Sequence, residues 1–257
     1  GCHKDNFPPA LTPYHRELAR TILWWATRFP EIPILLAKRD VAAAFKLVYV
    51  CPDDVGGMAT ELDGNALRRA YDGARKTLQR AGRVVNLLAL YLVLVFGFLG
   101  APGEWVVWAW TLARAFNSHA PEDPDWHDQS GFFCHFLVDD QILVEPDIGC
   151  RPEMSARCLD AAVVSLFGPK AINLAKLAVE GSYAKGQCVW GITLNTENRT
   201  GTLPDAKLFK AASLLRDADY DPGRERVDVK SVQVLRVNAQ HWLQLQPELG
   251  PELGAMD

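Results

Sequence analysis

Two adjacent aspartates, Asp139 and Asp140, interrupt an otherwise apolar stretch of the chain. Apolar residues extend from Phe132 to Val138 and resume at Ile142. This pattern predicts two strands of a hairpin with both carboxylates at its tip. Like charges at neighbouring positions repel, whereas a bound divalent cation would keep both carboxylates ionised. The alternative is an ordinary surface turn, because aspartate is a favoured turn residue.

A third acid, Asp40, ends an apolar segment about a hundred residues upstream. We expect a strand that ends at Asp40 and places its carboxylate beside the hairpin tip; the alternative is a surface acid at a strand end. Three carboxylates suit Mg²⁺, or Mn²⁺ in its place, because these ions prefer oxygen ligands. Two such ions about 3.5–4 Å apart can support an in-line phosphoryl displacement.

Between these acids lies the segment FGFLGAP, residues 96 to 102. Gly97 and Gly100 permit close approach of the backbone, and Pro102 suits the first turn of a helix. A loop of this kind can lie against a nucleotide or a base pair. The alternative is an ordinary connection between a strand and a helix.

The order and spacing of these elements resemble the palm of a reverse transcriptase of the gypsy or DIRS-like retroelements. The resemblance covers about residues 30 to 245. Its first four motifs, in chain order, are Asp40 with Ala44-Phe45, FGFLGAP with Trp105, Leu137 to Asp140, and Ile172 to Lys176. Val189 to Leu194 then resembles the hairpin that grips the primer, and Leu203 to Leu208 the start of the thumb. Each motif is loose, but their joint occurrence in this order is specific.

The resemblance implies an RNA-directed DNA polymerase that extends a primer 3′-hydroxyl with a deoxynucleoside triphosphate on an RNA or DNA template. In this family arrangement Asp40 and Asp139 would hold two Mg²⁺ ions with the help of Asp140, and Lys176 would protonate the departing pyrophosphate. The implied nucleotide-binding residues are Phe45, Phe96, Gly97 and Pro102, and the implied primer-grip residues are Trp190 and Gly191.

The chain departs from the family pattern at several points. Leu137, Val95 and Trp105 stand where such enzymes often carry Tyr, Pro and Phe, but all three are apolar. Only 39 residues precede Asp40, so the fingers segment that clamps the triphosphate has no alignable counterpart. Because the chain also begins with Gly1, we expect a piece of a polyprotein with little or no turnover alone. The alternative is a truncated or decayed module that folds, or binds nucleic acid, without catalysis.

Composition narrows the class of protein. A length of 257 residues with 49% hydrophobic content allows a sizeable core. The 27 basic and 31 acidic residues give a net charge of −4, which argues against a simple nucleic-acid-binding domain. The six cysteines form no CxxC pair and no secretory signal is present, which favours a reducing, intracellular location over secretion.

Two segments allow more than one interpretation. Residues 84–102 are nearly all apolar and about as long as a membrane-spanning helix, but their glycines, Pro102 and β-branched residues favour a buried strand and loop. We therefore expect no membrane partner. Residues 63–83 carry six basic and two acidic side chains at helical spacing. They predict either a solvated surface helix or one that follows a template backbone.

The predicted fold is α+β: a polymerase palm with an antiparallel sheet backed by helices, a partial thumb and a truncated remnant of the fingers. The predicted divisions are 1–39 for the fingers remnant or entry helix, 40–202 for the palm with the inserted basic helix 63–83, and 203–257 for the partial thumb or connection. Helices are expected over 13–29, 105–116, 152–167, 204–216 and 227–245, and further strands over 88–96 and 187–195.

Overall fold

The computed structural model describes residues 7–10, 15–62, 87–121, 130–216, 223 and 226–251. The predicted basic helix 63–83 lies outside these described residues. The chain forms two compact units, one of Gly1–Ala10 with Ala43–Trp108 and one of Leu11–Ala42 with Ala109–Asp257. We refer to them as the first and the second unit and describe each by itself.

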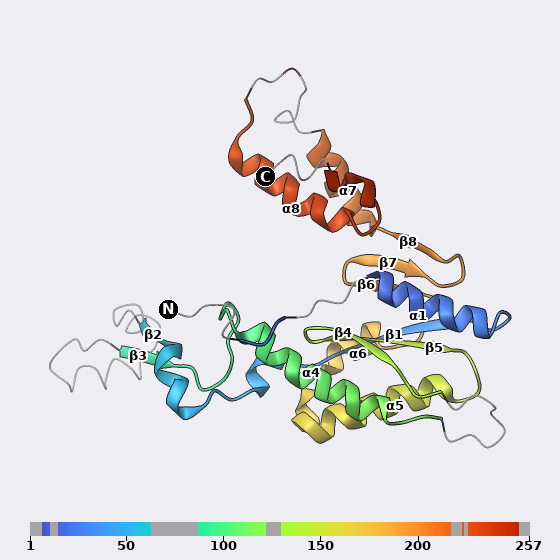
Figure 1. Ribbon diagram of the computed structural model, residues 1–257, viewed down its shortest axis with the longest axis horizontal. Helices are drawn as coiled ribbons and strands as arrows, with labels where there is room; N and C mark the ends of the chain where they lie inside the picture. Colours follow the sequence, from blue (N-terminus) through green and yellow to red (C-terminus); the bar gives the residue numbers. More distant parts are fainter. Residues whose placement is uncertain are drawn as a thin grey trace. The chain divides into compact units, whose positions relative to one another are not determined.

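The second unit is built on a three-stranded antiparallel sheet in the order β1-β5-β4 (Figure 1). Its strands are β1 (Ile34–Asp40), β4 (Cys134–Leu137) and β5 (Asp140–Pro146). The hairpin predicted around the aspartate pair is present, since β4 and β5 are joined by Val138 and Asp139 alone. Val138 has a φ of 54°, which is a costly conformation for a β-branched residue.

Helices cover both faces of this sheet. Helix α1 (His15–Arg28) lies on one face and helix α5 (Arg151–Phe167) on the other (Figure 1). Side chains alternate along a strand, so Ile142 and Val144 of β5 pack with the α1 residues Leu18, Ile22 and Trp25. β5 is buried along nearly its whole length because it is covered from both sides.

The α5 side of the sheet contains a buried ion pair. Arg151 donates to Glu145 from Nε over 2.6 Å, and Ser155 donates to the other carboxylate oxygen over 2.8 Å. The Arg151 guanidinium also lies 4.5 Å from the centre of the Trp25 ring. Burial raises the pKa of Glu145 to about 7 although Arg151 and Ser155 lower it. A buried pair of this kind depends on both partners, because either charge alone would be uncompensated.

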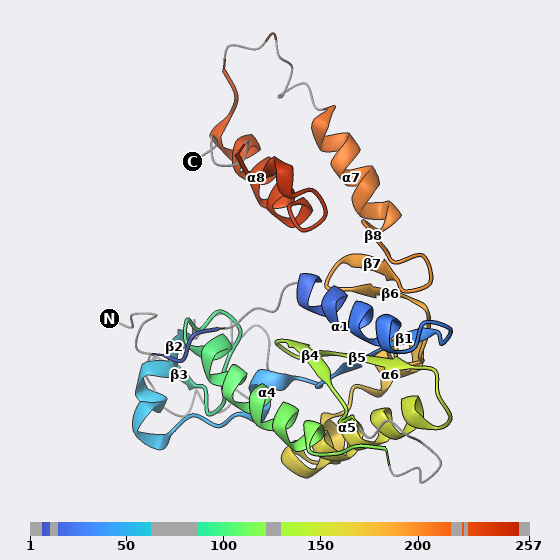
Figure 2. The ribbon, with the colours of Figure 1, turned by 45° about the vertical axis from the view of Figure 1, so that its right-hand side comes forward.

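A second sheet in this unit has the order β6-β7-β8 (Figure 2). Its strands are β6 (Gly186–Val189), β7 (Ile192–Asn195) and β8 (Thr200–Thr202). The single strand predicted over 187–195 is therefore wrong, because the chain reverses at Trp190-Gly191. The hairpin that the family resemblance implies at Val189 to Leu194 is present. Helices α7 (Asp205–Leu215) and α8 (Val229–Trp242) follow, within the ranges expected for them. A side-chain cap from Asp228 to Lys230 and Ser231 fixes the start of α8.

The first unit contains a two-stranded antiparallel sheet of β2 (Ala59–Leu62) and β3 (Leu87–Leu90). The predicted strand 88–96 is wrong beyond Leu90. Its partner β2 has only four residues, so the apolar residues that follow have no strand to pair with, apart from one isolated bridge between Tyr49 and Val93. Helix α4 (Ala101–Asn117) starts earlier than predicted and contains Pro102 in its first turn, as expected.

The segment considered for a membrane span is described from residue 87 onward, and this part forms no continuous helix. Residues 87–102 contain β3, an irregular stretch and the start of α4. None of the helices in the described ranges combines the length and the apolar character needed to cross a bilayer.

Candidate metal centre

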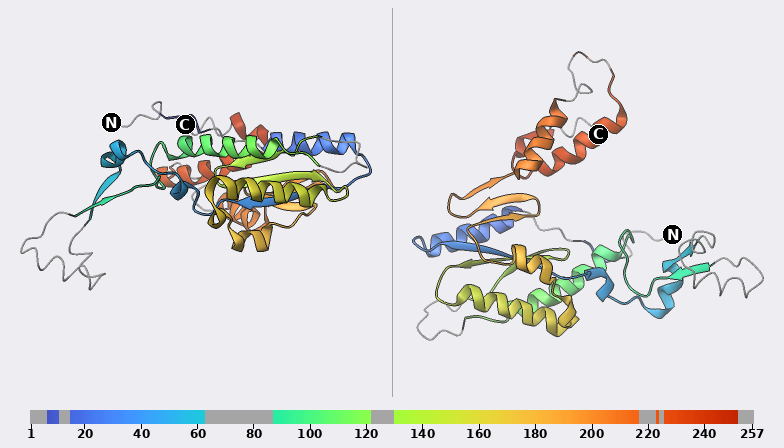
Figure 3. Two further views of the ribbon diagram at one scale, coloured as in Figure 1. Left: turned by 90° about the horizontal axis from the view of Figure 1, so that it is seen from below. Right: turned by 180° about the vertical axis from the view of Figure 1, so that it is seen from behind.

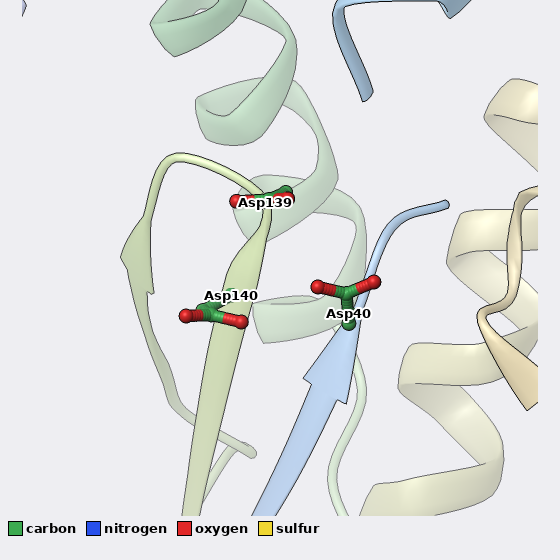
Figure 4. Close-up of side chains that lie close together, drawn as sticks. All are labelled: Asp40, Asp139 and Asp140. Atoms are coloured by element: carbon green, nitrogen blue, oxygen red, sulfur yellow. The ribbon is translucent and has the colours of Figure 1, made fainter. Parts of the chain in front are cut away.

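Three carboxylates meet at one end of the β1-β5-β4 sheet. Asp40 is the last residue of β1, and Asp139 and Asp140 lie at the hairpin tip beside it (Figure 4). One ligand oxygen from each of Asp40, Asp139 and Asp140 lies within 4.8 Å of the other two. The structure thus brings together the three acids that the sequence singles out, including one that is a hundred residues away from the others.

Backbone pairing explains why these side chains meet. Asp40 and Asp140 are partners in the β1–β5 ladder, so their side chains leave the sheet at the same level. Beyond the ladder, the Val41 amide donates to the Asp139 carbonyl oxygen over 3.0 Å. The buried Gln141 donates from Nε2 to the same carbonyl oxygen over 2.6 Å. These two bonds fix the turn on which Asp139 stands.

Burial and mutual repulsion both act on the hairpin acids. Burial raises the pKa of Asp139 above its usual value, and the charge of Asp40 raises it further, against the lowering effects of a backbone hydrogen bond and of Lys176. Burial also raises the pKa of Asp140; Lys176 opposes this shift, whereas Asp139 and Asp40 add to it. The cluster therefore favours a cation, because a positive charge would relieve the cost of holding three carboxylates ionised.

One protein cation already contacts the cluster. The Lys176 ammonium donates a short hydrogen bond to Asp40 Oδ1 and lies 3.4 Å from Asp140 Oδ1. The bond to Asp40 raises the pKa of Lys176. Lys176 belongs to helix α6 (Leu174–Glu180), which lies along β1 (Figure 3).

Asn173 also contacts the cluster, which no pattern in the sequence indicated. Its Nδ2 donates to Asp40 Oδ2 over 2.6 Å, while its Oδ1 accepts from the Lys176 amide and caps α6. Asparagine directly before a helix is a recognisable capping signal. The cap was therefore readable from the sequence, but its contact with an acid 133 positions away was not.

The residues implied to contact the nucleotide belong to the first unit. Phe45 is buried. Its ring forms T-shaped pairs with Phe96 and Trp105, with ring centroids 5.1 and 6.4 Å apart. Phe96 itself is 89% exposed. Gly97 has a φ of +89°, and a Cβ added there would meet nothing within 4 Å. Phe96 and Gly97 thus form an exposed part of the surface of the first unit.

Gly100 has a reason within the fold. A Cβ at this position would lie 2.4 Å from the Phe7 ring, which in turn packs edge to face against Phe98. Internal packing thus explains why position 100 requires glycine. At Gly97 the positive φ, rather than packing, requires glycine.

The residues implied to grip the primer form the tight turn between β6 and β7. Trp190 and Gly191 both have positive φ, 47° and 81°, as a two-residue hairpin turn of this hand requires. Two histidines hold the turn from neighbouring helices. His15 Nε2 donates to the Val189 carbonyl over 3.0 Å, and His241 Nε2 lies 3.2 Å from the Gly191 carbonyl oxygen. No motif in the sequence indicated either histidine.

No family model and no curated protein sequence matches the chain. Among solved structures, the chain is similar to a foamy viral protease-reverse transcriptase in complex with an RNA/DNA hybrid, with 12% identity and a TM-score of 0.48 over 81% of this chain and 21% of that one.

It is also similar to two telomerases at 12% identity. For telomerase from Candida albicans in complex with a fragment of telomeric RNA, the TM-score is 0.45 over 96% of this chain and 44% of that one. For apo telomerase from Candida tropicalis, truncated from its C-terminal domain, the TM-score is 0.43 over 76% of this chain and 40% of that one. The chain thus spans less than half the length of each of these structures. At 12% identity this likeness does not identify a function for the chain.

Proposed function

We propose that this chain is the palm and partial thumb of a reverse transcriptase and transfers deoxynucleotides to a primer 3′-hydroxyl with two divalent metal ions. The observation that carries the proposal is the meeting of Asp40, Asp139 and Asp140 at the end of an antiparallel sheet. Carboxylate oxygens are the ligands that Mg²⁺ and Mn²⁺ prefer. The contact of an ammonium group with two of these acids shows that the cluster accepts a cation.

The acidic residues would act as ligands. Asp40 and Asp139 would hold both ions, with Asp140 assisting from the first position of β5. The ions would supply an activated 3′-oxygen and neutralise charge on the leaving pyrophosphate. Lys176 would donate a proton to that leaving group, a role in keeping with its place at the cluster.

The remaining roles follow the motif order. Phe45 would stand beneath the sugar, and Phe96, Gly97 and Pro102 would face the new base pair. Trp190 and Gly191 would contact the primer strand at the β6–β7 turn. The same proposal divides the chain into 1–39, 40–202 and 203–257 as fingers remnant, palm and partial thumb, and assigns it to a gypsy or DIRS-like element.

A non-catalytic module is the second candidate function. It is favoured by one observation: Lys176 neutralises part of the acidic cluster without any metal. A decayed enzyme could retain this arrangement for stability alone. The two candidates differ in whether the cluster binds a divalent ion.

The first test is metal binding by the chain itself. A titration with Mn²⁺ followed by electron paramagnetic resonance should show bound ions in the parent and a large loss in Asp139→Asn. The second test joins the chain to a preceding fingers segment and measures dTTP incorporation on an oligo(dT)-primed poly(rA) template with Mg²⁺. Binding without incorporation would favour the non-catalytic module, and absence of binding would overturn the proposed function.

A further inference from the structure

The Lys176 ammonium contacts carboxylate oxygens of the cluster that would otherwise be open to a metal ion. It bonds Asp40 Oδ1 and approaches Asp140 Oδ1 to 3.4 Å. The second oxygen of Asp40 accepts from Asn173. Both oxygens of Asp40 are therefore engaged by α6 and its cap, and the carboxylate is only 6% exposed. A metal ion bound at Asp40 Oδ1 would lie beside the Lys176 ammonium, and the repulsion between the two cations favours withdrawal of the lysine.

Lys176 is the partner that can leave. Its side chain is 48% exposed, so its ammonium can return to water without crossing the core. Asn173 cannot leave as easily, because its side chain also caps α6 through the Lys176 amide. The backbone amide of Asn173 also donates to the backbone carbonyl oxygen of Asp40 over 3.2 Å.

Helix α6 does not depend on the Lys176 side chain for its position. None of its residues is buried, and polar contacts attach it to β1. Lys38 forms a short ion pair with Glu180 at the C-terminal end of the helix. Arg39 donates from Nη1 to the Gly181 carbonyl over 2.7 Å. These contacts persist if Lys176 turns away, so the exchange of cations requires a change of one side chain only.

We propose that Lys176 is a built-in competitor of the divalent metal. Its ammonium group binds Asp40 and Asp140 in the metal-free protein and withdraws when an ion binds. Asn173 keeps its bond to Asp40 Oδ2 throughout and holds the carboxylate in orientation. This inference rests on the metal site of the proposed function but does not require polymerase activity. It predicts that the chain's affinity for metal is set in part by the cost of displacing its own ammonium group.

The decisive variant is Lys176→Met, which keeps the length of the side chain and removes its charge. Mn²⁺ should bind about tenfold more tightly to it than to the parent, because no hydrogen bond between charged groups has to be broken. Two controls separate occupancy from general charge. Lys38→Met removes a nearby ammonium that pairs with Glu180, and Lys185→Met removes one that is 44% exposed and pairs with Glu197. Neither should change the affinity by more than about twofold.

A second readout follows the ammonium group directly. Brief acetylation with an amine-reactive ester, read by mass spectrometry, should modify Lys176 faster when Mn²⁺ or Mg²⁺ is present. The rate at Lys185 should not change. Asp139→Asn should abolish the effect of metal on Lys176 because the ion no longer binds.

The outcomes separate the two proposals. Equal affinity in the parent and Lys176→Met, or equal gains in Lys176→Met and Lys38→Met, would overturn the competitor role while leaving the metal site in place. An acetylation rate at Lys176 that metal does not change would overturn it as well. If no variant binds metal, the site of the proposed function fails and the competitor role fails with it.

Discussion

Asp40 and Asp140 lie directly opposite each other at the last pair of the β1–β5 ladder. Because successive side chains of a strand point to opposite faces, a slip of one residue in this pairing would send one carboxylate to the other side of the sheet. Buried residues on both faces of β5 oppose such a slip. The core packing of the sheet and the geometry of the acidic cluster are thus set by the same register.

Asp139→Asn should remove metal binding without unfolding the protein. In the metal-free state the raised pKa of Asp139 means that its ionised form costs folding free energy. That cost appears as the pH rises from the unfolded value of about 3.9 through the folded pKa, and the asparagine removes it. The metal-free variant should therefore melt at or above the parent temperature at pH 7, as scanning calorimetry can measure.

The exposed acid Asp147, at the other end of the sheet, provides the control for this change. Asp147→Asn should bind Mn²⁺ as the parent does. A variant at position 139 that retains parental affinity would show that the cluster is not the metal site.

Phe45→Val tests the proposed sugar contact. If Phe45 lies beneath the ribose, the smaller side chain should admit ribonucleotides, and the preference for deoxynucleotides should fall by well over tenfold, where each factor of ten is about 1.4 kcal/mol. The measurement is the ratio of kcat/KM for dTTP and UTP in the protein joined to its fingers segment. Phe116→Leu is the matched control, since Phe116 is fully buried and stacks on Phe132.

If Phe45 only packs in the core, its substitution should leave the preference for deoxynucleotides unchanged. Its ring contacts Phe96 and Trp105, so Phe45→Val should lower the free energy of unfolding by about 1–3 kcal/mol in either case. If both variants lose stability and neither changes the nucleotide ratio, Phe45 is only a core residue.

Gly191→Ala should loosen the β6–β7 turn. The residue has a φ of +81°, and an added Cβ would lie 2.1 Å from Lys207 Nζ and 3.0 Å from His241 Nε2. Strain and displacement of these side chains should together cost about 1–3 kcal/mol. Gly97→Ala is the control, because Gly97 has a similar φ of +89° with no atom within 4 Å of the added Cβ.

The difference between the two alanine variants measures the crowding at the turn. Adding Lys207→Ala should recover part of the loss in Gly191→Ala and none of it in Gly97→Ala, as urea unfolding can show. Equal losses in both single variants would mean that Lys207 and His241 move aside freely and do not hold the turn.

His135 makes stability depend on pH. Burial lowers its pKa to about 4, against the opposing charge of Glu17, and its Nε2 lies 2.9 Å from the Thr21 hydroxyl. The unfolded chain binds a proton near pH 6.5, whereas the folded protein does so only near 4, so stability is lost as the pH falls through this window. The loss should reach at most about 3 kcal/mol.

His135→Gln should remove most of this loss between pH 6.5 and 4 in urea unfolding. His119→Gln is the control, since His119 is exposed. A parental pH profile in His135→Gln would assign the acid sensitivity to the carboxylates instead.

Local patterns in the sequence predicted the parts of the site that local forces determine. The apolar segments on either side of Asp139 and Asp140 predicted the hairpin, and the apolar segment before Asp40 predicted its place at a strand end. Both predictions hold because alternation and turn chemistry act over a few residues. The meeting of Asp40 with the hairpin was an expectation from motif order, and only the long-range pairing of β1 with β5 realises it.

Other features depend on partners that no local pattern reveals. The residue pattern alone predicted one strand over 187–195, because a large aromatic residue at positive φ, such as Trp190, is uncommon and the surrounding residues all favour a strand. The hairpin at this point was implied only by the family resemblance. Strand β3 ends at Leu90 because β2 is short. The contacts of Lys176 and Asn173 with Asp40 join residues more than 130 positions apart.

The strand order β1-β5-β4 also has a kinetic consequence for how the protein acquires metal. β4 and β5 are joined by two residues and can pair early, whereas β1 reaches β5 only after closing a loop of about a hundred residues. A partly folded chain would therefore display two acids at the hairpin without the third. Tight capture of a divalent ion should begin only when β1 docks, so the rate of metal uptake during refolding should report the last step in assembly of the sheet.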